Sequence, residues 1–343
     1  MDDHRLASVR IVGSQLLVCP MKTERLNAQN PDHLQRAGEL LLAGELVAVP
    51  TETVYGLAAD ASNPEAVAKI FAAKRRPTNH PLITHIASLD QLPRWVKTVP
   101  DWVVPLAAAF WPGPLTLIFD RHPDVSDVIT GGLSTIGVRM PDHPVLLSLL
   151  QRFDIAVAAP SANPYQKLSP TSAEQVLAGM DGMIAAVLDG GPCGVGTEST
   201  ILRVGEQGAE ILRSGPITAD MLQPYLQVPV STPLNHEHSV SGNKKIHYQP
   251  NARVTLCTPD EITALAASAG PHSGALVYSP ALKSLPCQHL KVMPADHQGY
   301  RQALYAALYE ADCEGVTQLW VEAPPKDPAW ADIWDRLSRA AAD

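Results

Sequence analysis

The fold is decided by VAVPTETVYGLAAD, residues 47–60, where an apolar run leads directly into a polar cluster. The run from Val47 to Val49 predicts a short buried strand that stops at Pro50. Two threonines, a glutamate and a tyrosine follow within residues 51–55, and apolar residues return at Leu57. The question that this stretch raises is why a buried strand ends in hydroxyls, a carboxylate and a phenol.

Length and composition indicate a folded protein with room for one large domain or two ordinary ones. The chain has 343 residues, of which 45% are hydrophobic and 18% charged, so it can bury a core and is not disordered. The formal net charge is −9 and the pI is near 5.7. This balance argues against an extended basic surface for nucleic acid, although it leaves room for one basic pocket.

The five cysteines do not form a recognisable framework. They are widely spaced, with no C-x-x-C pair, so neither a disulfide scaffold nor a zinc knuckle is indicated, and reduced thiols are expected. No apolar run reaches the ~18 to 20 residues that a membrane helix needs. The N-terminal run IVGSQLLVCP has no clear small-residue cleavage site. We therefore expect a cytoplasmic enzyme without membrane contact.

The chain divides into an extension, a large domain, a linker and a small domain. Residues 1–20 are expected to be an N-terminal extension, and Met21 opens a more ordered pattern. Helical spacing with a glycine stop predicts a helix near 33–43, and the Asn63-Pro64-Glu65 cap predicts another to about Lys74. Further strands are predicted at 81–88, 114–120, 134–140, 154–160, 183–190 and 199–204. Their mixture with helices predicts an α/β domain over residues 21–226.

A linker and a second, smaller unit follow. Residues 227–252 are rich in Pro, Ser, Asn and His with little periodicity, which is typical of a linker. Alternating strand and helix patterns over 253–343 predict a small Rossmann-like α/β domain that lacks the G-x-G-x-x-G fingerprint.

Basic residues recur at the ends of a predicted helix and of predicted strands, and each has a structural and a functional interpretation. Lys74 and Arg76 sit at the end of a predicted helix, where they suit either the helix dipole or a triphosphate. Arg139 ends an apolar strand and is either a surface residue or a bidentate partner for a carboxylate. His85, on another strand, is either structural or functional.

Hydroxyls and glycines follow the later strands. APSANPYQKLSPT at 159–171 offers hydroxyls and amides that either hold ligand oxygens or simply make turns. DGGPCGVGTESTILRV at 189–204 has four glycines within 190–196, which let the backbone approach a ligand, but no Walker lysine. An H-E-H at 236–238 suggests metal without structured context. Many hydroxyls, three separated arginines and glycine-rich loops suit a ligand that carries both phosphate and carboxylate.

Six of these stretches, in this order and spacing, resemble the threonylcarbamoyl-AMP synthase family in its long two-domain form. They are PTETVYGL, KRRPTNHPL, WPGPLTLIF, TIGVRMPDHP, APSANP with LSPT, and GPCGVGTESTI with ILRSG. KIHYQP in the linker resembles the H-Y-x-P segment of the long form. The resemblance covers about residues 21 to 340 and implies a twisted, mixed-sheet YrdC-like domain before the small Rossmann-like domain.

Members of that family condense L-threonine, bicarbonate or CO2, and ATP into threonylcarbamoyl-AMP and pyrophosphate. The resemblance therefore implies a nucleotidyltransferase in tRNA processing, whose product a downstream threonylcarbamoyl transferase complex passes to the adenosine 3′ of the anticodon. It implies Mg2+ bound mainly through ATP phosphates, no protein metal cage, and only indirect contact with tRNA. In-line displacement at phosphorus needs positioning and charge neutralisation more than a covalent nucleophile, and no nucleophilic dyad is found in the sequence.

The resemblance also assigns the site residues. Lys74 and Arg76 take the triphosphate and are the catalytic pair. The implied L-threonine site is Thr53, Tyr55, His85, Arg139, Ala159 and Ser199. The implied nucleotide site adds His80, Thr135, Ser161, Asn163, Ser169, Arg213 and Tyr248, the last as a lid in the linker. This chain departs from several relatives in having His80 where they have Asn, and Ala159 where some have a hydroxyl, so Ala159 contributes backbone only.

Two other functions remain as alternatives. A carbamoyl transferase that works through carbamoyl-adenylate shares the fold, but such proteins usually carry zinc-binding, acyl-phosphatase or kinase-like segments that 343 residues do not accommodate. A non-catalytic RNA-binding module is disfavoured by the net charge of −9 and by the confinement of basic residues to pocket motifs.

Overall fold

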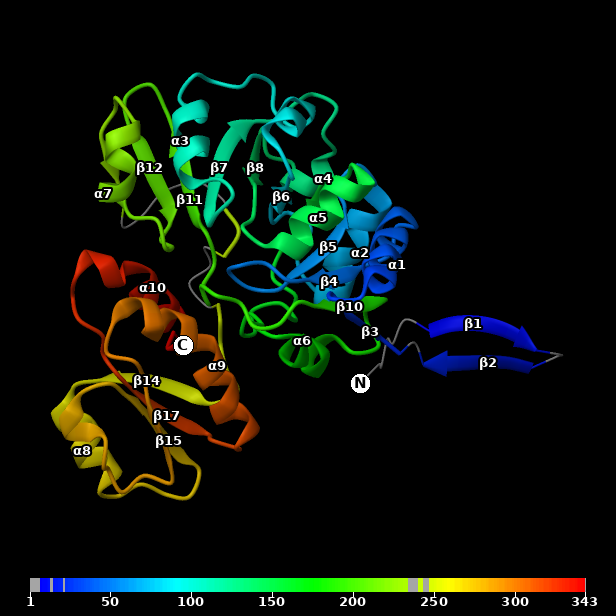
Figure 1. Cartoon of the computed structure of the whole chain (residues 1–343). Coiled ribbons are helices and arrows are strands. Elements are labelled where there is room, and N and C mark those ends of the chain that lie inside the picture. The colour runs from blue at the N-terminus through cyan, green and yellow to red at the C-terminus, as the bar shows by residue number, and fades with distance from the viewer. Residues whose placement is uncertain (1–6, 13–14, 21, 234–239, 243–246, 343) are drawn as a thin grey trace.

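The computed structural model describes residues 7–12, 15–20, 22–233, 240–242 and 247–342 (Figure 1). A large domain is built on an eleven-stranded sheet and a small domain on a four-stranded sheet. The N-terminal extension contains an antiparallel hairpin, β1 (Ala7–Val12) with β2 (Gln15–Pro20), which projects from the large domain. Met21 and the H-E-H at 236–238 lie outside the described residues.

The large sheet mixes parallel and antiparallel pairs in the order β13-β12-β11-β7-β8-β6-β9-β5-β4-β10-β3. Its strands are β3 (Glu24–Asn27), β4 (Val47–Val49), β5 (Gly56–Asp60), β6 (Ile83–His85), β7 (Leu115–Asp120), β8 (Thr135–Arg139), β9 (Val157–Ala158), β10 (Ala186–Asp189), β11 (Thr200–Val204), β12 (Ala209–Arg213) and β13 (Val230–Ser231). Each strand predicted in this domain contains an observed one. β13 lies in the segment predicted to be a linker and pairs with β12.

The helices of the large domain are α1 (Pro31–Leu42), α2 (Pro64–Lys74), α3 (Val103–Phe110), α4 (Asp127–Thr130), α5 (Pro144–Phe153), α6 (Ala173–Met180) and α7 (Ala219–Leu222), with short 3-10 turns η1 (Leu89–Arg94) and η2 (Gln223–Tyr225). The predicted cap of α2 is confirmed, because the Asn63 side chain accepts from the amides of Glu65 and Ala66, each at 3.1 Å. The helix ends in a left-handed Arg75. This end carries Lys74 and Arg76 toward the middle of the sheet.

The small domain is a parallel sheet in the order β14-β17-β15-β16, with helices packed on it. Its elements are β14 (Arg253–Cys257), α8 (Pro259–Ala266), β15 (Ser273–Val277), η3 (Pro280–Leu282), β16 (His289–Val292), α9 (His297–Cys313), β17 (Gln318–Glu322), η4 (Pro328–Trp330) and α10 (Ala331–Ala340). All-parallel pairing with crossover helices is the Rossmann-like arrangement, so the predicted two-domain α/β fold class is confirmed.

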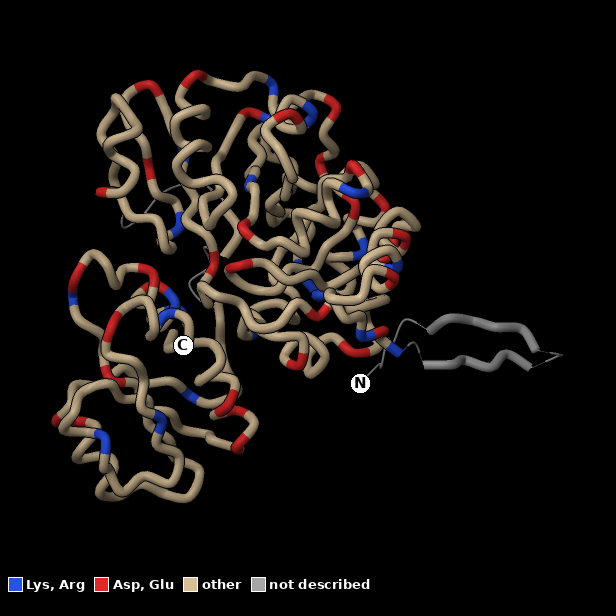
Figure 2. Tube along the Cα trace, viewed as in Figure 1, with Lys and Arg blue, Asp and Glu red and all other residues tan. Residues whose placement is uncertain are grey.

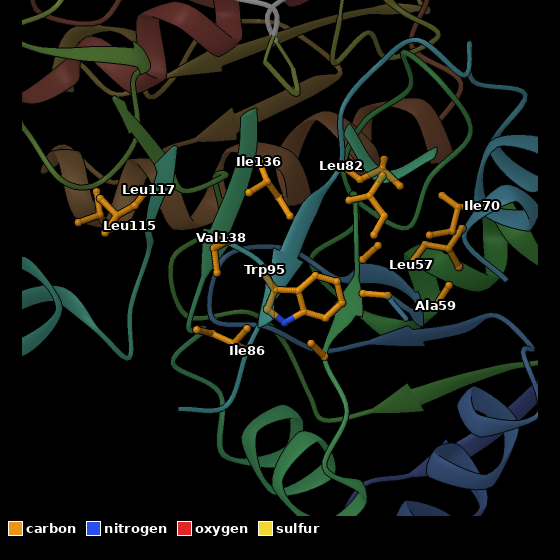
Figure 3. Close-up of a cluster of buried hydrophobic side chains, with 14 of the residues drawn as sticks. Leu57, Ala59, Ile70, Leu82, Ile86, Trp95, Leu115, Leu117, Ile136 and Val138 are labelled. Carbon is orange, nitrogen blue, oxygen red and sulfur yellow. The ribbon is translucent and has the colours of Figure 1, made fainter. Parts of the chain in front are cut away.

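The opening stretch is apolar because its strands are covered on both faces. Leu57 and Ala59 of β5 pack in a cluster around Trp95 with Ile70 of α2, as Figure 3 shows. Ala58, between them, faces the other side and packs in the cluster that contains Leu41 of α1. Alternate residues of one strand thus enter two cores, which explains the nearly continuous apolar run.

Charged residues are interspersed along the trace of both domains (Figure 2). Within the part of the chain that the structure describes, no helix combines the length and apolarity needed to cross a bilayer.

The two domains meet where the glycine-rich loop after β10 touches α9 and α10. Gly196 has φ +90, and an added Cβ would lie 2.6 Å from the carbonyl oxygen of Arg301. Thr197 donates its hydroxyl to Asp332 at 3.1 Å. The loop can approach the small domain this closely only because position 196 has no side chain.

Gly196→Ala is therefore expected to destabilise the protein by about 1–3 kcal/mol, since it combines a positive φ with a backbone clash. Gly194→Ala is the matched control, because a Cβ at Gly194 meets no atom within 4 Å. Chemical denaturation of both variants checks the prediction. Equal stabilities for the two variants would contradict it.

Candidate active site

A cavity lies where the polar cluster after β4 faces the ends of β6, β8 and β12. It is lined from the large domain and from the described parts of the linker by Thr51, Thr53, Val54, Gly56, Arg76, Ile83, His85, Arg139, Ala159, Pro160, Ser161, Glu198, Ser199, Arg213, Ser241, Gly242, His247 and Tyr248. The free volume is only about 40 Å³. A second cavity, of about 290 Å³, adjoins it at Ile83 and Ser241 and is lined by Thr135, Ser134 and Leu212 among others.

The two threonines of the opening stretch build a rigid turn. Thr51 Oγ1 accepts from the amides of Thr53 and Val54 at 3.1 and 3.2 Å and donates to the Val54 carbonyl at 2.6 Å. It also lies 2.8 Å from Thr53 Oγ1. Because the Thr51 proton is already used, the Thr53 hydroxyl donates to Thr51 and keeps its lone pairs for Arg139.

Arg139, at the end of β8, is held on two edges and open on the third. Its Nε donates to the Gly113 carbonyl at 3.2 Å, and its Nη2 donates to Thr53 Oγ1 at 3.0 Å. The same Nη2 lies 2.6 Å from Glu52 Oε2, which forms a buried ion pair. Nη1 has no partner among the described residues. The glutamate and threonines therefore orient a guanidinium whose remaining edge can take a carboxylate.

Three more cations are buried close by without an ion-pair partner among the described residues. Arg213, at the end of β12, donates to the Ser199 carbonyl, to Ser199 Oγ and to the Ser241 carbonyl at 2.9–3.0 Å. Arg76 donates to the Pro81 carbonyl at 3.1 Å, and its Nε has no partner in the described structure. Lys74 Nζ donates to the Ser161 and Asn163 carbonyls.

Burial makes these charges costly. It lowers the pKa of Arg76 to about 10, with a further lowering from Arg213 that two nearby tyrosines oppose. It lowers the pKa of Lys74 well below its usual value, with Arg76 adding repulsion. A bound anion would relieve both effects, because an opposite charge favours the protonated cation.

Two histidines in the cavity are held neutral. Burial lowers the pKa of His85 to about 3, with the positive charge of Arg139 adding to it. Burial likewise lowers the pKa of His247 to about 3. Nδ1 of each ring has no hydrogen-bond partner among the described residues. Both rings can thus offer a nitrogen to a neutral or anionic ligand without carrying charge.

The structure brings most of the predicted site residues to these two cavities. Those that line the first cavity are Thr53, Arg76, His85, Arg139, Ala159, Ser161, Ser199, Arg213 and Tyr248. Thr135 lines the adjoining one.

The other predicted residues lie around the cavities rather than on their walls. Tyr55 is fully buried, and its hydroxyl donates to the Gly191 carbonyl at 2.7 Å and accepts from the Gly190 amide at 3.2 Å, so it holds the glycine loop. Lys74 donates to the backbone carbonyls of Ser161 and Asn163, so it supports the segment that carries Ser161. His80 Nδ1 lies 3.4 Å from the Tyr165 hydroxyl.

Asn163 and Ser169 line a different cavity, of about 430 Å³, between the two domains. The Ser169 hydroxyl donates to Glu198 at 2.6 Å. Its position is therefore one layer behind the first cavity, against a residue that lines it.

Sequence reasoning assigned no role to Glu52, Glu198, His247 or the Ser241–Gly242 segment. Glu52 and His247 are each adjacent to a residue that was assigned, and Glu198 stands next to Ser199. That adjacency was the available signal. Ser241 and Gly242 had none, because their place at the cavity depends on the path of the linker.

A family model described as "Telomere recombination" (Sua5, YciO, YrdC) matches residues 39–215, and one described as "Threonylcarbamoyl-AMP synthase, C-terminal domain" matches residues 217–342. The threonylcarbamoyl-AMP synthase of Bacillus subtilis is 38% identical over 331 residues, which cover 93% of this chain and 95% of that protein. The chain belongs to the threonylcarbamoyl-AMP synthase family.

Two further comparisons come from Pyrococcus abyssi. Its threonylcarbamoyl-AMP synthase is 43% identical over 225 residues, 64% of this chain and 66% of that protein. The crystal structure of P. abyssi Sua5 complexed with L-threonine matches with a TM-score of 0.85 at 33% identity, over 93% of this chain and 97% of that one. Both domains are matched together, so the predicted long two-domain form of the family is confirmed.

The neutral histidines predict how the stability of this family member depends on pH. Unfolded histidine has a pKa near ~6.5, whereas folded His85 titrates at about 3. Between these values the unfolded chain binds the extra proton, so the free energy of unfolding falls as pH falls below 6.5. The loss approaches ~1.4 kcal/mol per pH unit for each such histidine.

His85→Gln should therefore reduce the slope of unfolding free energy against pH between about 6 and 4.5, where most carboxylates stay ionised. Urea denaturation across this range gives the slope. His272→Gln is the control, since His272 is exposed. An unchanged slope in His85→Gln would contradict a buried neutral imidazole.

Proposed function

We propose that this chain is an L-threonylcarbamoyladenylate synthase, which condenses L-threonine, bicarbonate or CO2 and ATP into threonylcarbamoyl-AMP and pyrophosphate. One observation carries the proposal. The open edge of Arg139 faces the same small cavity as two buried arginines that lack ion-pair partners in the described structure. An enzyme that joins an amino acid to a nucleotide requires a carboxylate-binding site next to a phosphate-binding site.

The amino acid binds beside the polar cluster at residues 51–55. Its carboxylate takes the free Nη1 of Arg139, and its amine then lies near the neutral His85, whose Nδ1 can accept a hydrogen bond. The amine must be uncharged to attack CO2, and a neutral acceptor beside a cation does not favour the ammonium form. The attack forms an N–C bond and releases one proton, which leaves a carbamate anion.

The nucleotide occupies the rest of the cavity and its neighbour. Arg76 and Arg213 neutralise the phosphates, and the adjoining cavity of about 290 Å³ takes the nucleoside beside Thr135. The carbamate oxygen attacks the α-phosphorus, the bond to the β-phosphate oxygen breaks, and pyrophosphate leaves with its electron pair. Such a displacement depends on positioning and electrostatics, which is why the site needs no covalent nucleophile.

We include Mg2+ in this proposal as an ion that binds together with ATP, mainly through its phosphates. Among the described residues, no group of three or more His, Cys, Asp or Glu side chains is placed to hold a metal ion. Glu52 already faces Arg139, and Glu198 already faces Arg336. Phosphate oxygens are thus the natural ligands of the ion, which supplies charge neutralisation when bound.

Because the proposed product is chemically reactive, we expect a partner that receives it. Threonylcarbamoyl-AMP is a mixed anhydride, and such a compound acylates water as well as its intended acceptor. We include in the proposal a downstream threonylcarbamoyl transferase complex, to which the product is handed for modification of the adenosine 3′ of the tRNA anticodon. The net charge of −9 supports only indirect contact with tRNA.

The activity is tested by mass spectrometry of the full chain incubated with ATP, Mg2+, bicarbonate and L-threonine. The proposal predicts threonylcarbamoyl-AMP together with pyrophosphate, and loss of both when threonine is omitted. Parallel reactions with serine and glycine measure selectivity, and one with carbamoyl phosphate tests for a carbamoyl transferase. Carbamoyl-adenylate formation without a threonine-dependent product would contradict the proposal.

Substitution of Arg139 and of Arg76 should affect the binding of threonine and of ATP separately. Arg139→Lys removes the planar fork and is expected to raise the KM for threonine by at least about tenfold, with the KM for ATP changed less than about threefold. Arg76→Lys should do the reverse. Steady-state assay of pyrophosphate release gives both constants. If either variant changed the KM for threonine and the KM for ATP equally, the two binding sites would be wrongly assigned.

A further inference from the structure

The largest fully buried side chain in the described structure is a charged residue of the small domain, Arg336 on α10. Its Nε donates to Glu198 Oε2 at 2.6 Å, and its Nη2 donates to the Ser214 carbonyl at 3.1 Å. Both acceptors belong to the large domain. The Nη1 of Arg336 donates to Asp335 of the same helix. The large domain thus binds two of the three guanidinium nitrogens of a buried arginine, which ties the domains tightly at this point.

Glu198 is the centre of this contact and stands inside the glycine-rich loop. It accepts from the Ser169 hydroxyl at 2.6 Å and from the Tyr305 hydroxyl of α9 at 3.0 Å. Burial alone would raise its pKa, but Arg336 and then Arg213 outweigh burial and lower it to about 2, so the carboxylate is ionised. The next residue, Ser199, is the one that Arg213 holds at the cavity.

Arg336 also supports the linker tyrosine from behind. Its guanidinium carbon lies 5.1 Å from the centre of the Tyr248 ring, and the Tyr305 ring lies 5.8 Å from the same ring. Tyr248 is 1% exposed and has φ +59, a left-handed conformation that costs a residue with a side chain about 1–3 kcal/mol. Its hydroxyl, without a partner among the described residues, lies beside Gly242 at the cavity. Surrounding contacts must therefore hold it there.

We propose that Arg336 is a positioning residue for the reaction: through it the small domain holds two groups in place at the nucleotide site. One is Tyr248, and the other is Arg213, which the Glu198–Ser199 loop binds through Ser199. The inference rests on the proposed function for the identity of the nucleotide. It gives the small domain a part in ATP binding, although none of that domain's own residues lines the cavity among the described ones. Cation–π contact and a buried ion pair share one guanidinium, so lid and loop are fixed together.

The matched control comes from an ion pair within the small domain, at the same face that meets the large domain. Arg301 of α9 lies 3.4 Å from Asp332, which in turn accepts from Thr197. Arg301 is 9% exposed, and among the described residues its side chain pairs with Asp332 and forms no hydrogen bond or ion pair with Glu198 or Tyr248. Arg301→Met removes a buried arginine beside the domain interface without removing the support of Tyr248.

The experiment compares full-length Arg336→Met, the double variant Glu198→Gln/Arg336→Met, and Arg301→Met. Arg336→Met leaves Glu198 buried and unpaired, and the double variant removes that charge, so part of the lost thermal stability should return. Calorimetric titration measures the affinities for a non-hydrolysable ATP analogue and for L-threonine. In both variants that lack Arg336, nucleotide affinity is expected to fall by about tenfold or more, with threonine affinity changed less than about threefold.

Three results would overturn the inference. Recovery of nucleotide affinity together with stability in the double variant would make Arg336 purely structural. An equal loss of nucleotide affinity in Arg301→Met would assign the effect to the interface as a whole. An equal loss of both substrates in Arg336→Met would indicate general disruption of the site. Because the readout is binding, a wild-type chain that binds ATP but forms no threonylcarbamoyl-AMP contradicts the proposed function alone.

Discussion

Buried positive charge is the constraint on which this site depends. Lys74, Arg76, Arg139 and Arg213 are each at most 7% exposed, and of these only Arg139 forms an ion pair with a described carboxylate. A buried charge without a counter-charge costs several kcal/mol, so the fold tolerates this cluster by giving each cation backbone carbonyls and hydroxyls. Those neutral acceptors orient the cations without cancelling them, and an anionic ligand completes the balance.

The rest of the structure can be understood as the means of holding that charge. The ends of β8 and β12 and the C-terminus of α2 bring the four cations close together. The threonine turn at 51–54 locks Arg139, and Tyr55 anchors the glycine loop from beneath. Across the loop, the Glu198–Arg336 pair ties the second domain to the same point. In the proposed function, an amino-acid carboxylate and a triphosphate are the anions that this arrangement would hold.

The sequence predicted the elements whose signals are local. Asn63-Pro64-Glu65 marks the start of α2 because the cap is formed by those residues themselves, and the apolar runs mark the buried strands. Five strands of the two domains were not predicted: β3, β5, β12, β13 and β16. β5 begins at Gly56 inside the polar cluster, and β12 has the mixed pattern AEILR, so neither differs from its surroundings without its pairing partner. β9 proved shorter than its apolar run because α5 extends to Phe153 and Asp154 takes a left-handed cap.

The same distinction holds for the site. Residues within a motif could be assigned by resemblance, but Glu52, Glu198 and Arg336 act through contacts between segments up to 138 positions apart, which a single sequence does not reveal. The most direct test is a crystal structure of the chain with L-threonine and a non-hydrolysable ATP analogue. The account predicts the carboxylate on Arg139 Nη1, the phosphates on Arg76 and Arg213, and the nucleoside beside Thr135. A nucleotide in the interdomain cavity beside Asn163, or threonine away from Arg139, would contradict it.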